Sequence, residues 1–134
     1  MKSTNRRRFI RKTAVSAVAL IAGGKALANE LPAKDPIVRV ARLKIDPAQL
    51  DNYKVLLKEV GETSVKTEPG VLTLYSASEK GNPANITVFE IYADDAAYKS
   101  HIETPHFKKY KTATKGMVLS LELVEMTPIV LASK

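Results

Sequence analysis

Hydrophobic and polar residues alternate in four segments of the chain, which is the pattern of half-buried β-strands. In residues 37–45, every second side chain from Ile37 onward shares one face, and the side chains between them share the other. The other three segments are residues 71–78, 85–92 and 117–126. A Lys-Gly-Asn-Pro turn at residues 80–83 separates the second segment from the third. We therefore expect these two strands to form a hairpin.

Between the strands, apolar residues recur at helical spacing. Asp46 and Pro47 open a predicted helix that runs to about Lys66, because Asp is a favoured N-cap and proline suits the first helical position. Two shorter helices are predicted after the third strand, over residues 94–103 and 104–115. The resulting order, β-α-β-β-α-α-β, predicts a ferredoxin-like α+β fold with an antiparallel sheet and helices on one face.

The sheet is expected to carry apolar residues on both faces. We assign one group to the face away from the helices: Leu72, Leu74, Phe89, Ile91, Leu119, Leu121 and Leu123. In a monomer this group would form a large apolar patch in water. We therefore expect a homodimer packed sheet to sheet, with the apolar residues 129–131 reaching across to the partner.

The charge of the chain is concentrated at its N-terminus. The formal net charge is +7, but seven of the 21 basic residues precede residue 29 and all 14 acidic residues follow it. The remainder is formally neutral, so the charge gives no support to nucleic-acid binding.

The same N-terminal segment has the order of an export signal. Residues 5–11, Asn-Arg-Arg-Arg-Phe-Ile-Arg, resemble the twin-arginine consensus, and a short apolar run and Ala26-Leu27-Ala28 follow. We predict a twin-arginine (Tat) signal peptide over residues 1–28, a linker over 29–36 and one domain over 37–134. The protein is then expected to meet the Tat translocase during export and to work in the periplasm or otherwise outside the cytoplasm. The absence of cysteine excludes disulfides and thiol chemistry.

Three stretches give the chain a family resemblance: residues 68–71 (Glu-Pro-Gly-Val), 90–94 (Glu-Ile-Tyr-Ala-Asp) and 97–110, which contains His-Ile-Glu-Thr-Pro-His-Phe. Together they resemble the antibiotic biosynthesis monooxygenase (ABM) domain family, most closely its small quinol-monooxygenase branch. The resemblance implies a dimeric α+β barrel. It also implies oxidation of quinols or phenols by molecular oxygen without flavin, haem or metal. The alternatives are a non-catalytic dimeric module that binds a small molecule and an isomerase acting on a small sugar-like substrate.

The candidate catalytic residues are His101, Glu90 and His106. Either histidine can serve as general base for a phenolic proton, and Glu90 can orient a histidine or act as the base itself. A local structural role for both histidines, or a pairing of Glu90 with Arg39 or Arg42, remains the alternative. The histidines lie five residues apart, no nearby pair of carboxylates or thiols completes a ligand set, and we expect no metal.

Aromatic residues supply the candidate substrate-binding side chains: Tyr92, Tyr98, Tyr75, Phe107 and Tyr110. Tyr92 can stack on an aromatic ring or donate its hydroxyl. Ordinary core packing is the alternative for each of them. The haem-degrading branch of the family uses a Trp where this chain has Tyr92, and the chain contains no Trp. Haem degradation is therefore not expected, and no cofactor is predicted.

Overall fold

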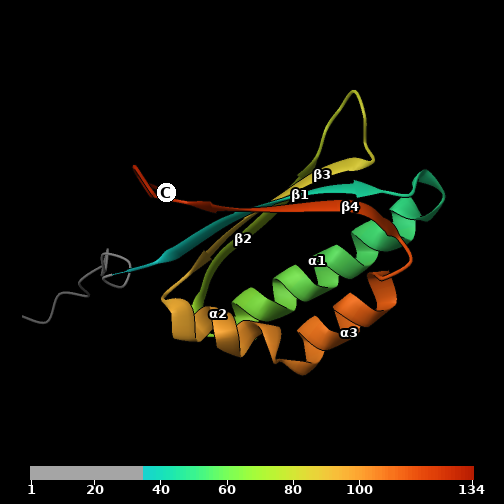
Figure 1. Ribbon diagram of the computed structural model, residues 1–134. Coiled ribbons are helices and arrows are strands. Elements are labelled where there is room, and N and C mark those ends of the chain that lie inside the picture. The colour runs from blue at the N-terminus through green and yellow to red at the C-terminus, as the bar shows by residue number, and fades with distance from the viewer. Residues whose placement is uncertain (1–34) are drawn as a thin grey trace, which may run out of the picture.

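The computed structural model describes residues 35–134, and the predicted signal peptide lies outside the described residues. Four strands and three α-helices follow one another as predicted (Figure 1). The strands are β1 (Ile37–Ile45), β2 (Val71–Ser78), β3 (Asn85–Tyr92) and β4 (Val118–Met126). The helices are η1, a 3₁₀ turn (Pro47–Gln49), then α1 (Leu50–Thr67), α2 (Asp95–Ile102) and α3 (Pro105–Thr114). Within residues 35–134, none of the helices has the length and apolarity needed to cross a membrane.

The predicted helix starts are confirmed by their caps. The Asp46 carboxylate accepts a hydrogen bond from the Ala48 amide at 2.9 Å, and the Asp94 carboxylate accepts one from the Ala97 amide at 2.7 Å. Thr104 caps α3 in the same way, with Pro105 at the first helical position. Each cap satisfies an amide that the helix itself leaves without a partner. These short-range preferences set the points at which α2 and α3 begin.

The four strands form one antiparallel sheet in the order β2-β3-β1-β4, and the helices cover one of its faces (Figure 1). This is the predicted ferredoxin-like α+β arrangement. Residues paired across antiparallel strands point to the same face. Arg39 pairs with Glu90, and Ala41 with Val88, so β1 and β3 present these four side chains to the helices.

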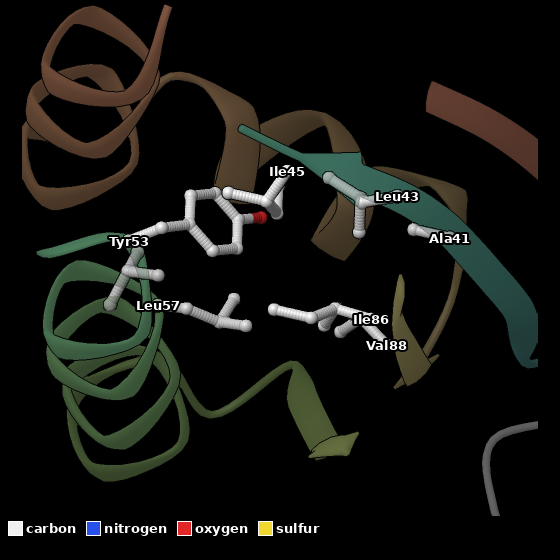
Figure 2. Packing of buried hydrophobic residues seen from close by; sticks show 8 residues of the cluster. Ala41, Leu43, Ile45, Tyr53, Leu57, Ile86 and Val88 are labelled. Carbon is white, nitrogen blue, oxygen red and sulfur yellow. The ribbon is translucent and has the colours of Figure 1, made fainter. Parts of the chain in front are cut away.

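The core lies between the sheet and α1 (Figure 2). Ala41, Leu43 and Ile45 of β1 face Tyr53 and Leu57 of α1, and Ile86 and Val88 of β3 complete the layer. Both Tyr53 and Ile45 have no exposed surface. Fully burying a side chain of this size stabilises a fold by about 1.5–3 kcal/mol. The alternation in the sequence therefore predicted correctly which side chains of β1 share a face.

The assignment of several leucines to the opposite face was wrong. Leu74, Leu121 and Leu123 lie on the helix-facing side, because Leu74 pairs with Glu90, Leu121 with Leu43 and Leu123 with Ala41. Alternation separates two faces but does not say which one faces the helices. Register irregularities also occur in the pairing of β2 with β3 and of β4 with β1, and the sequence pattern gave no sign of them.

Candidate active site

A cavity of about 640 Å³ lies between the sheet and the helices. Its walls are largely apolar, with Ala41, Leu43 and Val88 from the sheet and Leu57 and Val60 from α1. Leu121 and Leu123 of β4 form a further wall, and these two residues are 44% and 55% exposed. The cavity is therefore roomy enough for a small aromatic molecule and is bordered by the partly exposed side chains of an edge strand.

A carboxylate joins the two histidines at the end of this cavity. Glu68 Oε2 lies 3.0 Å from His101 Nδ1 and 2.6 Å from His106 Nε2. His101 is buried, with 2% of its surface exposed, and it lines the cavity, whereas His106 does not. Burial raises the pKa of Glu68, but the hydrogen bonds from His106 and His101 outweigh burial, and the pKa stands below its usual range. Glu68 is therefore ionised at neutral pH.

The charge of Glu68 fixes the tautomers of both rings. An ionised carboxylate only accepts hydrogen bonds, so His101 Nδ1 and His106 Nε2 each carry a hydrogen. In the neutral His101 ring, Nε2 then holds the lone pair. The Glu68–His101 pair is thus of the same kind as the carboxylate–imidazole pairs that orient histidines in hydrolases.

Three chain segments meet to form this cluster. Glu68 ends α1, and its amide donates to the Ser64 carbonyl at 2.9 Å. The following turn packs tightly on α2, because a Cβ added at Gly70 would lie only 2.4 Å from the Ala97 Cβ. The Ala93 amide also donates to the Gly70 carbonyl at 2.8 Å. The absence of a side chain at Gly70 therefore allows the Glu68 turn to approach the helix that carries His101.

The second carboxylate of the site, Glu90, is in a different environment. It lines the cavity from β3, and burial raises its pKa, against the opposing effects of the Tyr92 hydroxyl, His101 and Arg39. Tyr92 has only 1% of its surface exposed, and its pKa is raised by burial and by the adjacent Glu90. Tyr92 therefore remains a neutral phenol, and burial makes the Glu90 carboxyl harder to ionise than that of an exposed glutamate.

The two arginines of β1 do not pair with Glu90. Arg39 Nη2 donates to Glu125 Oε1 at 3.2 Å, and Arg42 Nη1 donates to Glu122 Oε2 at 3.4 Å. Arg39 lines the cavity, and its guanidinium lies 3.8 Å from the centre of the Tyr98 ring. Arg42 points to the opposite face of the sheet, where it pairs with Thr87 and Glu122 across the neighbouring strands.

Four of the five aromatic candidates are brought to the cavity: Tyr92, Tyr98, Phe107 and Tyr110. Tyr92 contacts Tyr98 and His101, each at a ring distance of 5.3 Å, and Phe107 lies 4.9 Å from His101. The Tyr110 hydroxyl lies 2.6 Å from that of Tyr53. Tyr75 is different: it pairs with Phe89 on the far face of the sheet and is 67% exposed. The structure does not place Tyr75 in the cavity.

The residue that sequence reasoning missed is Glu68. Its Glu-Pro-Gly stretch was interpreted only as the end of a helix and as a family landmark. The sequence pattern offers Glu90 as the carboxylate that can orient a histidine, whereas in the structure Glu68 accepts the hydrogen bonds of both rings. The donor atoms of Glu68, His101 and His106 all lie within 4.8 Å of one another, so these three residues could hold a metal ion. In the structure, His101 Nδ1 and His106 Nε2 are both hydrogen-bonded to the Glu68 carboxylate.

Comparison with known proteins identifies similar sequences and folds. Residues 36–113 match the family described as antibiotic biosynthesis monooxygenase. A candidate antibiotic biosynthesis monooxygenase from Bacteroides thetaiotaomicron is 53% identical, covering 75% of this chain and 95% of its own, with a TM-score of 0.72. A candidate monooxygenase from Lactobacillus acidophilus is 31% identical with a TM-score of 0.68, and the match covers 71% of this chain and 46% of that chain. A search among curated proteins found no match.

Proposed function

Since the chain belongs to the antibiotic biosynthesis monooxygenase family, we propose that it is a cofactor-independent monooxygenase of quinols or phenolic aromatic compounds that uses molecular oxygen. One observation carries the proposal. His101 lies in the wall of a largely apolar cavity, and Glu68 fixes its tautomer so that Nε2 is the basic nitrogen. A base of this kind in an apolar cavity suits the removal of a proton from an aromatic hydroxyl group.

In the first step, His101 Nε2 takes the phenolic proton. The resulting imidazolium is stabilised by Glu68, which is ionised and hydrogen-bonded to Nδ1. The phenolate is electron-rich, and Tyr92, Tyr98 and Phe107 provide ring faces and edges on which its ring can stack. Held general bases of this kind contribute a factor of about 10²–10⁴ in rate.

The oxygen step needs no further reductant. The phenolate gives one electron to O₂, and the substrate radical and superoxide combine in a new C–O bond. The peroxide formed takes back the proton held by His101. Loss of the proton from the ring carbon that carries the peroxide and cleavage of the O–O bond leave one oxygen atom on the ring as a carbonyl and release the other as water. The substrate loses four electrons and O₂ gains four, so a quinol and O₂ give a hydroxyquinone and water.

Oxygen uptake by the purified protein tests the proposal. A panel of hydroquinones, naphthohydroquinones and polycyclic phenols is screened with an oxygen electrode, and the products are identified by mass spectrometry. We expect His101→Asn to lower kcat by about 10²-fold or more, in line with loss of a general base. Tyr75→Phe is the control, since Tyr75 lies on the far face of the sheet. Full activity of His101→Asn would show that His101 is not the base.

The cavity itself favours a second candidate, a binding module without turnover. A largely apolar cavity of about 640 Å³ can hold an aromatic ligand whether or not any reaction follows. Anaerobic titration followed by admission of air separates the two functions. Ligand binding without oxygen consumption across the panel favours the binding module, whereas oxygen-dependent product formation favours the monooxygenase.

We also propose that the protein works as a homodimer. The described residues expose Tyr75 and Met126 on the face away from the helices and Leu121 and Leu123 on the edge strand β4. Leu72 and Leu119 are exposed as well. Apolar surface of this kind is typical of protein interfaces. Light scattering during gel filtration should give twice the monomer mass, and Tyr75→Glu together with Met126→Glu should weaken the dimer.

We also propose export through the twin-arginine route, on the basis of the N-terminal sequence alone. Replacement of Arg6 and Arg7 by lysine should retain the protein in the cytoplasm, as followed by cell fractionation. An export signal of this type would place the enzyme away from cytosolic nicotinamide cofactors, which is compatible with a reaction driven by substrate and oxygen alone.

A further inference from the structure

Arg39 carries a largely buried charge with few hydrogen-bond partners. Only 19% of its side chain is exposed. A guanidinium has five N–H groups, yet among residues 35–134 one acceptor is found for Arg39, the Glu125 carboxylate. Arg39 Nε is buried with no acceptor in this part of the chain. A buried donor without a partner is costly, so an additional acceptor supplied by a ligand would be favourable.

The surroundings of Arg39 leave its positive charge only partly compensated. Glu125 is 68% exposed, so water weakens its interaction with Arg39. Glu90 is the cross-strand neighbour of Arg39, but it makes no ion pair with the guanidinium. Arg39 therefore gives the cavity wall a guanidinium whose charge is only partly compensated, among largely apolar side chains.

Arg39 and His101 are linked by a row of aromatic rings. The guanidinium lies on the Tyr98 ring, Tyr98 contacts Tyr92, and Tyr92 contacts His101. All four side chains line the same cavity. The cation and the base are thus separate groups with ring surfaces between them, and a flat aromatic ligand can reach both.

We propose that Arg39 binds the carboxylate of the substrate, and that the substrate class is an aromatic hydroxy acid. This inference rests on the proposed function only for the role of His101 at the reacting hydroxyl. A carboxylate accepts two N–H donors from one guanidinium in a geometry that fixes its orientation. The aromatic ring would lie along Tyr98 and Tyr92, with its hydroxyl group directed toward His101.

Two fluorescent probes that differ in one group test this assignment. 6-Hydroxy-2-naphthoate carries a hydroxyl and a carboxylate at opposite ends, and 2-naphthol lacks the carboxylate. Dissociation constants for both are measured without oxygen at pH 7, so that no turnover is needed. We expect the acid to bind at least tenfold more tightly than the naphthol. We expect Arg39→Gln to remove this preference while 2-naphthol binding changes less than threefold.

Arg42→Gln is a matched control. Arg42 lies on the same strand and has the same kind of ion pair with a glutamate of β4, but it faces away from the cavity. The Arg42→Gln variant should therefore keep the tenfold preference for the acid over the naphthol. Arg39→Lys, which keeps the charge but not the fork of donors, should retain part of the preference. Thermal unfolding of each variant establishes that it is folded.

Three outcomes would overturn the assignment: no preference for the acid in the unaltered protein, an unchanged preference in Arg39→Gln, or no binding of either probe at millimolar concentration. The failure of the proposed function has a different signature. If the acid binds through Arg39 but no quinol or phenol consumes oxygen, the binding site stands and the monooxygenase proposal falls.

Discussion

Glu68 and Glu90 are two carboxylates placed against the same histidine region with opposite protonation preferences. Glu68 accepts hydrogen bonds from two imidazoles, which lower its pKa despite burial. Glu90 lies in the cavity wall, and burial raises its pKa. Two residues of one type thus have pKa values that their surroundings shift in opposite directions: the ionised form of Glu68 is favoured, and that of Glu90 is disfavoured.

Among these variants, removal of the Glu68 carboxylate should lower the free energy of unfolding the most. Glu68→Ala leaves two ring N–H groups without an acceptor, and hydrogen bonds to charged groups contribute about 1.5–3 kcal/mol each. We expect the free energy of unfolding to fall by about 3 kcal/mol in urea titrations at pH 7. Glu103→Ala is the control, since the exposed pair of Glu103 with Lys108 should contribute under about 1 kcal/mol. Equal losses in the two variants would contradict a special role for Glu68.

A smaller effect is expected when the Glu68 turn is displaced but the carboxylate is kept. Gly70→Ala would place a methyl group 2.4 Å from the Ala97 Cβ, so the turn or α2 must move. Overpacking of this kind costs about 1–3 kcal/mol. Gly81→Ala, where an added Cβ meets nothing within 4 Å, should be nearly neutral. Restoration of stability by Ala97→Gly in the Gly70→Ala background would confirm the contact.

Glu90 should respond in the opposite direction. Glu90→Gln removes a carboxylate whose ionised form is disfavoured by burial, so we expect the variant to be more stable than the unaltered protein at pH 7. Because the pKa of Glu90 is raised in the folded state, this gain should shrink as the pH falls through that raised pKa.

The pKa of Glu68 is lowered, so the stabilisation that Glu68 provides should be present above about pH 4.5 and be lost below it. The stability of Glu68→Ala and Glu90→Gln, measured against the unaltered protein between pH 3 and 8, tests this contrast.

The smallest effect is expected from metal chelation. If Glu68 acts as a hydrogen-bond acceptor for both histidines, EDTA should change neither the unfolding midpoint nor any oxygen uptake. Elemental analysis of the purified protein complements this measurement. A metal bound at one equivalent and lost in His106→Ala would instead assign the cluster to metal binding.

The fold could be predicted from the sequence because its signals are local. Period-two alternation, Asp46, Asp94 and Thr104 as caps, and proline at the first helical position each act over a few residues. The face on which Leu121 and Leu123 lie could not be predicted, because that depends on strand pairing and on register irregularities between distant segments.

The candidate site could be predicted only in part, because residue types and local positions are visible in the sequence but contacts between distant segments are not. His101 stood out by its residue type, and Glu90 and Tyr92 stood out by residue type and by their position on a strand. In the structure all three line the same cavity. Glu68 lies 33 residues from His101, and only the tertiary approach at Gly70 brings them together. The Glu-Pro-Gly landmark was the available signal, since a carboxylate at the end of a helix next to a close-packed glycine can face a neighbouring element.

The partly exposed leucines of β4 have a kinetic consequence. Leu121 and Leu123 line the cavity and are nevertheless 44% and 55% exposed, because they lie on an edge strand. A ligand can therefore pass these side chains while α1 and α3 stay in place. In the free protomer, ligand association should then be set by diffusional encounter, and its rate constant should show little of the strong temperature dependence that a helix-opening step would impose.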